Sequence, residues 1–315
     1  MMQGRPFYGE NYQPREYIFA ARDRCDETPD LIRAVRTHRF KYIRNFFSHV
    51  SHMQPNRFKD TWKGKSIQHM RQLYMDGLLK EETARYFSPT RTAEELYDLE
   101  NDPWEMHNLA GDPAFRDTLQ KMQDLLVSTI FEKKDLGFIP EPVLEDLGRQ
   151  YGTKYYILQQ PENLNLVREC MEVMELDDHK NVAALQKALE HERAPVRFWA
   201  AYGLGNIPEL SGNASAALQK ALNDDSDAVK IAAARALCRL GHTEPSLQIL
   251  AGSLSDHPNV IIRLYSALFI QDLNDSLILK VLPEIEKAKN NSYDFAGRVN
   301  VKLSDKFREN AFLSF

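Results

Sequence analysis

Arginine and lysine residues crowd one stretch near the N-terminus of the chain. The stretch holds Arg22, Arg24, Arg33, Arg36, Arg39, Lys41 and Arg44. A guanidinium group can donate two parallel hydrogen bonds to one oxyanion, so the stretch is a candidate for binding an anionic substrate. The same stretch also contains the acidic residues Asp23, Asp26, Glu27 and Asp30. The alternative is therefore that these charges are paired with one another or solvated on a small sheet.

Other residues that could bind a metal or attack a substrate do not form a convincing set. His49 and His52 are three residues apart, but no third ligand is near them in the sequence, and zinc needs three or four. The cluster of Asp23, Asp26 and Glu27 could hold a cation or work as an acid–base pair, but carboxylates in a charged segment are usually paired or solvated. The three cysteines, at positions 25, 170 and 238, form no CxxC pair. We therefore predict no metal site and no catalytic residue in this chain.

Composition limits the kinds of protein that the chain can be. Its 315 residues can form two modest domains, and 43% hydrophobic with 27% charged residues is ordinary for a globular protein. The net charge of −5 argues against a nucleic-acid binder, although residues 1–60 hold eleven Lys or Arg against seven Asp or Glu. No apolar run approaches the roughly 20 residues of a membrane helix, and Met1–Pro6 shows no signal-peptide core.

The N-terminal part of the sequence predicts a small α+β domain built on an antiparallel sheet. Alternating aromatic and β-branched residues predict four short strands, at Glu16–Ala21, Ile32–Thr37, Phe40–Asn45 and Leu96–Leu99, with a helix around Ser66–Leu79. A later helix is predicted to begin at Asp112-Pro113 and to pack on the sheet through Leu119, Met122, Leu125, Leu126 and Ile130. Tyr97 and Trp104 are expected to anchor the sheet to that helix rather than to bind a sugar.

The C-terminal half contains an internal repeat. The heptamer at Ala183–Leu189 returns unchanged at Ala216–Leu222, which gives a period of 33 residues. Matched segments follow at Val196 and Val229, and a weaker third copy runs from Leu247 to Leu268. Such self-similarity is typical of an all-α solenoid of paired helices, and this pattern resembles HEAT repeats. The alternative is two amphipathic hairpins that are similar by chance. We divide the chain into residues 1–134, a linker of short helical pieces at 135–161, and a solenoid at 162–315.

Two segments of the N-terminal domain resemble the C-terminal region of sulfatases of the alkaline-phosphatase-like superfamily. One is Glu94–Ala110, with the sequence EELYDLENDPWEMHNLA, and the other begins with Arg22–Glu27 and continues through 30–37 and 40–45. The start of the chain, Met2–Phe7, resembles the segment that follows the family's catalytic domain. The resemblance covers residues 1 to about 145.

The resemblance implies a specific chemistry for the parent enzyme. A Cys or Ser in a C-x-P-x-R or S-x-P-x-R motif becomes formylglycine, and a divalent cation, usually calcium, neutralises the sulfate oxygens of a sulfated carbohydrate. This chain contains neither motif, and in Ser88-Pro89-Thr90-Arg91 the proline lies one place too early. We therefore expect calcium and formylglycine in a catalytic domain that precedes this chain, and a C-terminal sulfatase fragment that is inactive alone.

Within that resemblance, Arg22, Arg24 and Asp26 are the candidates for substrate contact, because they lie in the family-like segment. The expected partners are the catalytic domain, a sulfated glycan, and a protein bound by the solenoid. Periplasmic or extracellular localisation follows from the resemblance alone. The alternative function is a non-catalytic interaction module, in which the solenoid binds a partner and the sheet is only scaffold.

Overall fold

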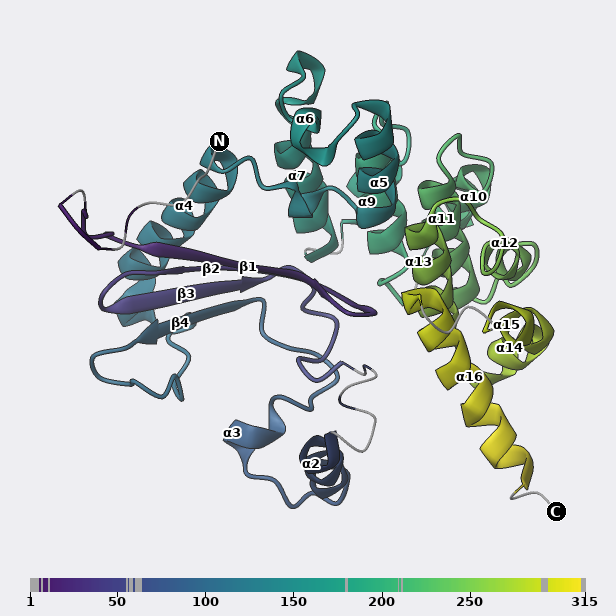
Figure 1. Ribbon diagram of the computed structural model, residues 1–315, viewed down its shortest axis with the longest axis horizontal. Coiled ribbons are helices and arrows are strands. Elements are labelled where there is room, and N and C mark those ends of the chain that lie inside the picture. The colour runs from purple at the N-terminus through teal and green to yellow at the C-terminus, as the bar shows by residue number, and fades with distance from the viewer. Residues whose placement is uncertain are drawn as a thin grey trace. The chain divides into compact units, whose positions relative to one another are not determined.

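The computed structural model describes residues 6, 8–10, 12–54, 56, 59, 64–178, 181–208, 210, 212–289 and 294–312 (Figure 1). The predicted family-like segment Met2–Phe7 therefore lies, apart from Pro6, outside the described residues. The chain forms two compact units. The first, the sheet unit, comprises Met1–Cys25, Pro29–Gln54 and Ser66–Lys133. The second, the helical unit, comprises Lys134–Phe315 together with the short segments Asp26–Thr28 and Pro55–Lys65.

A four-stranded antiparallel sheet forms the centre of the sheet unit. The strands are β1 (Ile18–Cys25), β2 (Thr28–Arg36), β3 (Phe40–Asn45) and β4 (Glu94–Asp98), and they lie in that order across the sheet. In the register, Ala34 of β2 lies opposite Ile43 of β3, and Tyr42 of β3 lies opposite Leu96 of β4. The predicted α+β class is confirmed. The first strand begins two residues later than expected and continues to Cys25, so the charged segment from Arg22 belongs to a strand.

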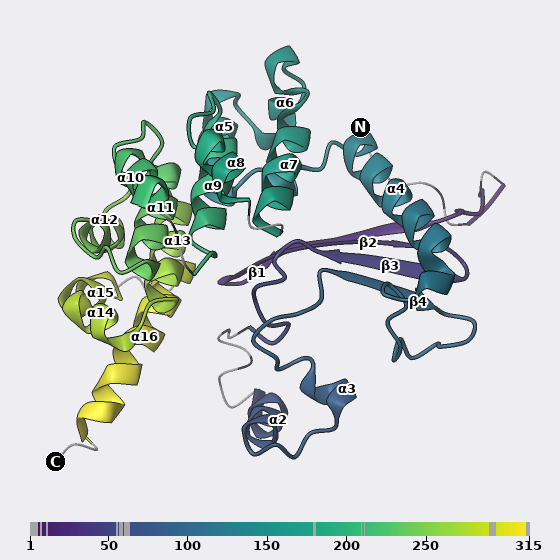
Figure 2. The same ribbon diagram turned by 180° about the vertical axis from the view of Figure 1, so that it is seen from behind.

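Helix α4 (Arg116–Glu132) covers one face of this sheet (Figures 1 and 2). It follows a short turn of 3-10 helix, η2 (Pro113–Phe115), whose first turn is capped by the Asp112 side chain, which accepts a hydrogen bond from the Ala114 N–H at 2.9 Å. The predicted apolar stripe buries Met122, Leu126 and Ile130. A polar contact adds to this packing, because Gln123 donates to Glu94 of β4 at 2.6 Å.

The segment between β3 and β4 contains helices α2 (Lys65–Met75) and α3 (Glu81–Ala84). The predicted helix at 66–79 is therefore present but ends earlier, before Gly77, whose φ of 70° suits glycine. The expected role of Trp104 was wrong, because 83% of this residue is exposed and it anchors nothing. Tyr97 is buried, but its hydroxyl donates to Glu95 on the sheet, away from α4.

Residues 135–161, where we expected a linker of short helical pieces, form short helices that pack within the helical unit. They are η3 (Leu136–Phe138), α5 (Glu141–Gln150) and α6 (Lys154–Ile157), followed by η4 (Pro161–Asn163). The indole N–H of Trp199 donates to the Phe138 carbonyl at 2.7 Å, and the Asn259 amide donates to the Pro142 carbonyl at 2.9 Å. These hydrogen bonds join the segment to the repeat helices that follow.

The repeats predicted from the heptamer are confirmed as successive helix pairs. After α7 (Leu166–Asp178), the pairs are α8 (Val182–Ala188) with α9 (Ala194–Leu204), α10 (Gly212–Ala221) with α11 (Asp227–Arg239), and α12 (Ser246–Gly252) with α13 (Val260–Gln271). The second helices begin at positions 194, 227 and 260, so the period of 33 residues is kept through all three pairs. Helices α14 (Asp275–Lys280), α15 (Leu282–Ala288) and α16 (Phe295–Phe312) follow. No helix within the described ranges is long and apolar enough to cross a membrane.

Arginine side chains connect neighbouring repeats. Arg197 of α9 donates to Asp224, in the loop before α11, at 2.7 Å. Arg235 of α11 donates to Asp272, after α13, at 2.8 Å, and its guanidinium lies 4.4 Å from the centroid of the Tyr202 ring on α9. Arg235 thus contacts the repeats on both sides of its own, and its side chain is only 4% exposed.

The three cysteines differ in accessibility. Cys25, the last residue of β1, is exposed, whereas Cys170 on α7 and Cys238 on α11 are buried. Burial raises the pKa of the Cys170 thiol and raises the pKa of Cys238 to about 12. The two buried thiols therefore stay protonated and unreactive at neutral pH.

We predict that Arg235→Ala destabilises the helical unit by about 2–4 kcal/mol, because it removes a buried guanidinium that packs on an aromatic ring and pairs with Asp272. Arg239→Ala is the matched control. Arg239 pairs with the same carboxylate at 2.8 Å, but its side chain is 35% exposed, so its loss should cost about 1 kcal/mol or less. Urea unfolding followed by far-UV circular dichroism measures both. Equal losses would contradict the role given to Arg235.

Candidate functional site

A cleft of about 590 Å³ lies on the face of the sheet that α4 leaves uncovered. We call it the sheet cleft. Ile43, Glu95 and Tyr97 form part of its wall from β3 and β4, and their side chains alternate with Tyr42 and Leu96, which face α4. The remaining walls come from Ile32 of β2, from the segment between β3 and β4 and from the loop after β4. The polar side chains from these segments are His52, Arg85, Ser88, Thr90, Arg91, Thr92, Glu105 and Asn108.

Arg91, which lines the cleft, forms a buried ion pair with Asp30. Arg91 donates to both carboxylate oxygens of Asp30, one of them at 3.1 Å, and its Nε donates to the Phe47 carbonyl at 3.1 Å. Both side chains are almost fully buried. Because each partner satisfies the other, we assign this pair to structure rather than to substrate binding. The Ser88–Arg91 segment that partly matched a nucleophile motif thus ends in a structural arginine.

Glu95 and His52 face each other in the cleft. The Glu95 carboxylate accepts hydrogen bonds from the Asn45 amide at 2.7 Å and from the Tyr97 hydroxyl at 2.6 Å, and it lies 3.9 Å from Nε2 of His52. Burial, followed by the positive charge of Arg91, lowers the pKa of His52 below its usual value. Burial and the hydrogen bond to Glu95 raise the pKa of Tyr97, so the phenol stays protonated.

Arg85 is the cation best placed to bind an anion in the cleft. Its guanidinium donates to the backbone carbonyls of Glu105, at 3.1 Å, and Met106, at 3.5 Å, and to the Tyr86 hydroxyl at 3.4 Å. Among the described residues, no carboxylate forms an ion pair with it. Carbonyl groups orient the guanidinium without neutralising its full charge, so it can still attract a sulfate or carboxylate group.

The three residues predicted to contact substrate lie outside this lining. Arg22 comes closest, because its Nε is 3.6 Å from the Asp30 carboxylate that also binds Arg91, and its side chain is 40% exposed. Arg24 follows two residues later on β1 and is half-buried. Asp26 is exposed in the turn after β1, with a φ of 54°. The structure thus places Arg22 beside the buried pair, and none of the three residues lines the cleft.

Sequence reasoning missed most of the cleft. His52 was weighed only as half of a metal pair, and Arg85 and Glu95 were not considered. The signal for Glu95 was present, because residues alternate between the two faces of a strand and Leu96 has to face the core. Nothing in the sequence indicated that Arg85, some 20 residues before Glu105, would bind its carbonyl.

A calcium ion does not fit the side chains that the structure describes. No three His, Cys, Asp or Glu side chains come together in the described parts of the chain. In the charged segment of the N-terminal part, Asp23 is used in an ion pair with the buried Arg33 at 2.6 Å. Hard cations need several oxygen ligands, and these residues do not supply them.

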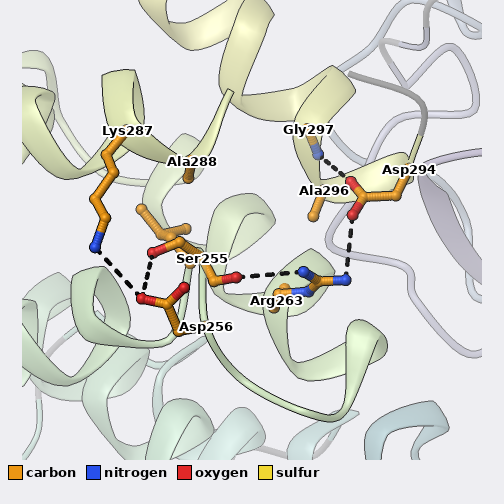
Figure 3. A pocket seen from close by; sticks show the side chains of 9 residues that line it. Ser255, Asp256, Arg263, Lys287, Ala288, Asp294, Ala296 and Gly297 are labelled. Carbon is orange, nitrogen blue, oxygen red and sulfur yellow. Dashed lines mark hydrogen bonds and ion pairs between the residues drawn. The ribbon is translucent and has the colours of Figure 1, made fainter. Parts of the chain in front are cut away.

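A second pocket, of about 350 Å³, lies between the C-terminal helices of the helical unit (Figure 3). Arg263 and Lys287 line it, but each already has a carboxylate partner. Arg263 pairs with Asp294 at 3.3 Å, and Lys287 pairs with Asp256 at 3.3 Å. Both cations of this pocket are therefore paired with carboxylates, and the sheet cleft is the better candidate for an anionic ligand.

Comparisons with known proteins identify a chain with a sulfatase-like part and HEAT-like repeats. The family described as HEAT repeats matches residues 182–269, from the start of α8 to two residues before the end of α13. The sulfatase-like part rests on similarity to an "ulvan-active sulfatase" from Formosa agariphila, with 35% identity over 144 residues. The similarity covers 45% of this chain and 24% of that enzyme, so the chain spans about a quarter of the length of this curated relative.

We predict that His52 titrates below its usual pKa of about 6.5. The folded state favours the neutral imidazole, because burial penalises the charged form. The free energy of unfolding is therefore highest above about pH 6.5. It decreases as the pH falls from there through the folded-state pKa, where the buried imidazole must take up a proton. Glu95→Gln should lower the pKa of His52 further, because the Glu95 carboxylate is the nearest group that raises it. NMR titration of the imidazole measures both effects. A pKa at or above 6.5 in the wild-type chain would refute this assignment.

Proposed function

We propose that this chain supplies a substrate-binding part of a sulfuric ester hydrolase that acts on sulfated carbohydrate. The observation that supports it most directly is the Arg85 guanidinium, held in the sheet cleft by carbonyl groups and without a carboxylate partner among the described residues. The similarity to an enzyme named for its action on ulvan points to a sulfated polysaccharide of that kind. On this proposal, Arg85 binds a sulfate or carboxylate group of the glycan.

The hydroxyl-rich surroundings of Arg85 suit a carbohydrate. Ser88, Thr90 and Asn108 line the same cleft and can exchange hydrogen bonds with sugar hydroxyl groups. Arg22 and Arg24, with Asp26 in the adjoining turn, remain proposed contacts for a glycan that extends beyond the cleft. Arg22 is the better candidate of the two arginines, because its side chain is 40% exposed and its Nε lies 3.6 Å from the Asp30 carboxylate.

We further propose that these 315 residues bind the glycan without hydrolysing it. The sequence contains no Cys or Ser followed by proline two residues later and arginine four residues later. Calcium and formylglycine would belong to a catalytic domain that acts with this chain. Positioned arginines lower the free energy of the bound substrate, but binding without a nucleophile does not produce turnover.

An Arg85→Ala variant tests the binding role. Loss of a charge-assisted hydrogen bond, about 1.5–3 kcal/mol, should raise the Kd for a sulfated ulvan oligosaccharide by about tenfold or more. Arg149→Ala is the matched control, because Arg149 is an exposed arginine of the helical unit. Isothermal titration calorimetry of the full chain measures both. An unchanged affinity in a folded Arg85→Ala protein would contradict the proposal.

A sulfate-release assay tests the absence of turnover. With calcium present, the purified chain should release no sulfate from an aryl sulfate or from a sulfated oligosaccharide beyond the buffer rate. Activity that persists through further purification would contradict the proposal. Activity that begins only when a separate sulfatase catalytic domain is added would support it.

The second candidate function is a non-catalytic interaction module, and the match to HEAT repeats favours it. Stacked helix pairs present extended surfaces that commonly bind other proteins. On this alternative, the solenoid binds a protein and the sheet unit is scaffold. The calorimetric experiment separates the two functions, because a scaffold predicts no affinity for sulfated oligosaccharides and no effect of Arg85→Ala.

A further inference from the structure

Trp104 is exposed in a way that packing does not explain. It is 83% exposed, although an indole is among the largest apolar side chains. It belongs to the loop after β4, within the segment that resembles sulfatases. An exposed aromatic ring in an ordered loop often marks a surface that binds a ligand or a partner.

The loop that carries Trp104 is held firmly on both sides of it. The Asp102 N–H donates to the Asp98 carbonyl at 2.7 Å, and the Asp102 carboxylate accepts from the His107 N–H at 2.8 Å. That hydrogen bond is the main cause of the lowered pKa of Asp102. Glu105 pairs with Lys41 of β3 at 2.7 Å. The indole is therefore presented from a fixed backbone, which limits the entropy lost when a ligand binds.

The backbone at Glu105 is strained in order to make this turn. Its φ of 56° lies in the left-handed region, which is unfavourable for a residue other than glycine. In this conformation the Glu105 carbonyl accepts the hydrogen bond from Arg85, while its side chain reaches Lys41. One residue thus connects Trp104 to the guanidinium that we propose binds the anion.

Trp104 directly precedes a residue that lines the sheet cleft. Its immediate neighbour Glu105 lines the cleft, as does Asn108 further along the same loop. Successive Cα atoms are about 3.8 Å apart, so the indole starts within one residue of the lining. An exposed ring one residue from the cleft lining, and the Arg85 cation bonded to that next residue, suit a ligand that offers an apolar face and a negative charge close together.

We propose that Trp104 stacks against a pyranose ring of the sulfated glycan whose anionic group binds Arg85. One face of many pyranose rings presents C–H groups, which pack on an aromatic ring, while the hydroxyl and sulfate groups point outward to polar partners. The inference rests on the proposed function and deepens it. It assigns Trp104 the recognition of the sugar ring and Arg85 the recognition of its charge.

Paired ligands separate these two roles. Sulfated and desulfated ulvan oligosaccharides of equal length are titrated into the full chain, and Kd is measured for each. Trp104→Ala should weaken binding of both ligands by a similar factor, about three- to tenfold, since stacking involves the ring and not the sulfate. Arg85→Ala should weaken binding of the sulfated ligand much more than that of the desulfated one.

Two further variants serve as controls. Trp104→Phe keeps an aromatic face and should retain most of the affinity. Retained affinity would assign the effect of Trp104→Ala to the loss of the aromatic ring. Tyr155→Ala removes another exposed aromatic side chain, on α6 in the helical unit, and should change nothing. Tryptophan fluorescence gives a second readout, because a ligand-induced change seen in the wild type should disappear in Trp104→Phe.

The outcomes distinguish this inference from the proposed function. Binding that depends on Arg85 but not on Trp104 overturns the stacking role and leaves the proposed function standing. No binding of any sulfated oligosaccharide by the wild-type chain overturns both. A Trp104→Ala protein that binds glycan normally but no longer associates with a sulfatase catalytic domain would show that the indole contacts protein, and so would also overturn the inference.

Discussion

The buried Asp30 carboxylate determines how the sheet unit is built around its cleft. A carboxylate removed from water costs several kcal/mol unless cations and hydrogen-bond donors surround it. Its main partner, Arg91, lies 61 residues further along the chain, just before β4. The ion pair therefore fixes the end of the long segment between β3 and β4 against β2. His52 and Arg85 lie on the segment held in this way, so their positions depend on the Asp30–Arg91 pair.

The two faces of the sheet have different chemistry because only one is covered by a helix. On the α4 side, Tyr42 and Gln123 both donate to Glu94, and apolar side chains fill the remaining space. On the other side lies Glu95, the next residue of the strand and also a glutamate. Its carboxylate accepts hydrogen bonds from Asn45 and Tyr97 at the wall of the cleft. Two adjacent glutamates thus have structural and site-forming roles because a strand alternates its side chains between its faces.

The sequence predicted most of the fold because the relevant signals were local or periodic. The repeated heptamer located α8 and α10, and the Asp112-Pro113 pair located the start of the helix that covers the sheet. The cleft could not be predicted in the same way, because its members meet only through long-range contacts. Arg85 is placed by carbonyl groups 20 residues away, and no composition rule separates it from the paired Arg91. Trp104 was misjudged because a large aromatic residue beside a strand is usually buried, whereas here it is 83% exposed.

The different burial of the three thiols has a practical consequence. A maleimide reagent reacts with the thiolate form of an accessible cysteine, and the high pKa and burial of Cys170 and Cys238 protect both of them in the folded chain. Cys25, exposed at the end of β1, remains as the position that reacts. The natural sequence therefore offers a single attachment point for a fluorophore or spin label on the first unit, without any engineered cysteine. Combined with a second probe on the solenoid, such a label would give the distance between the two units and its change when a glycan is added.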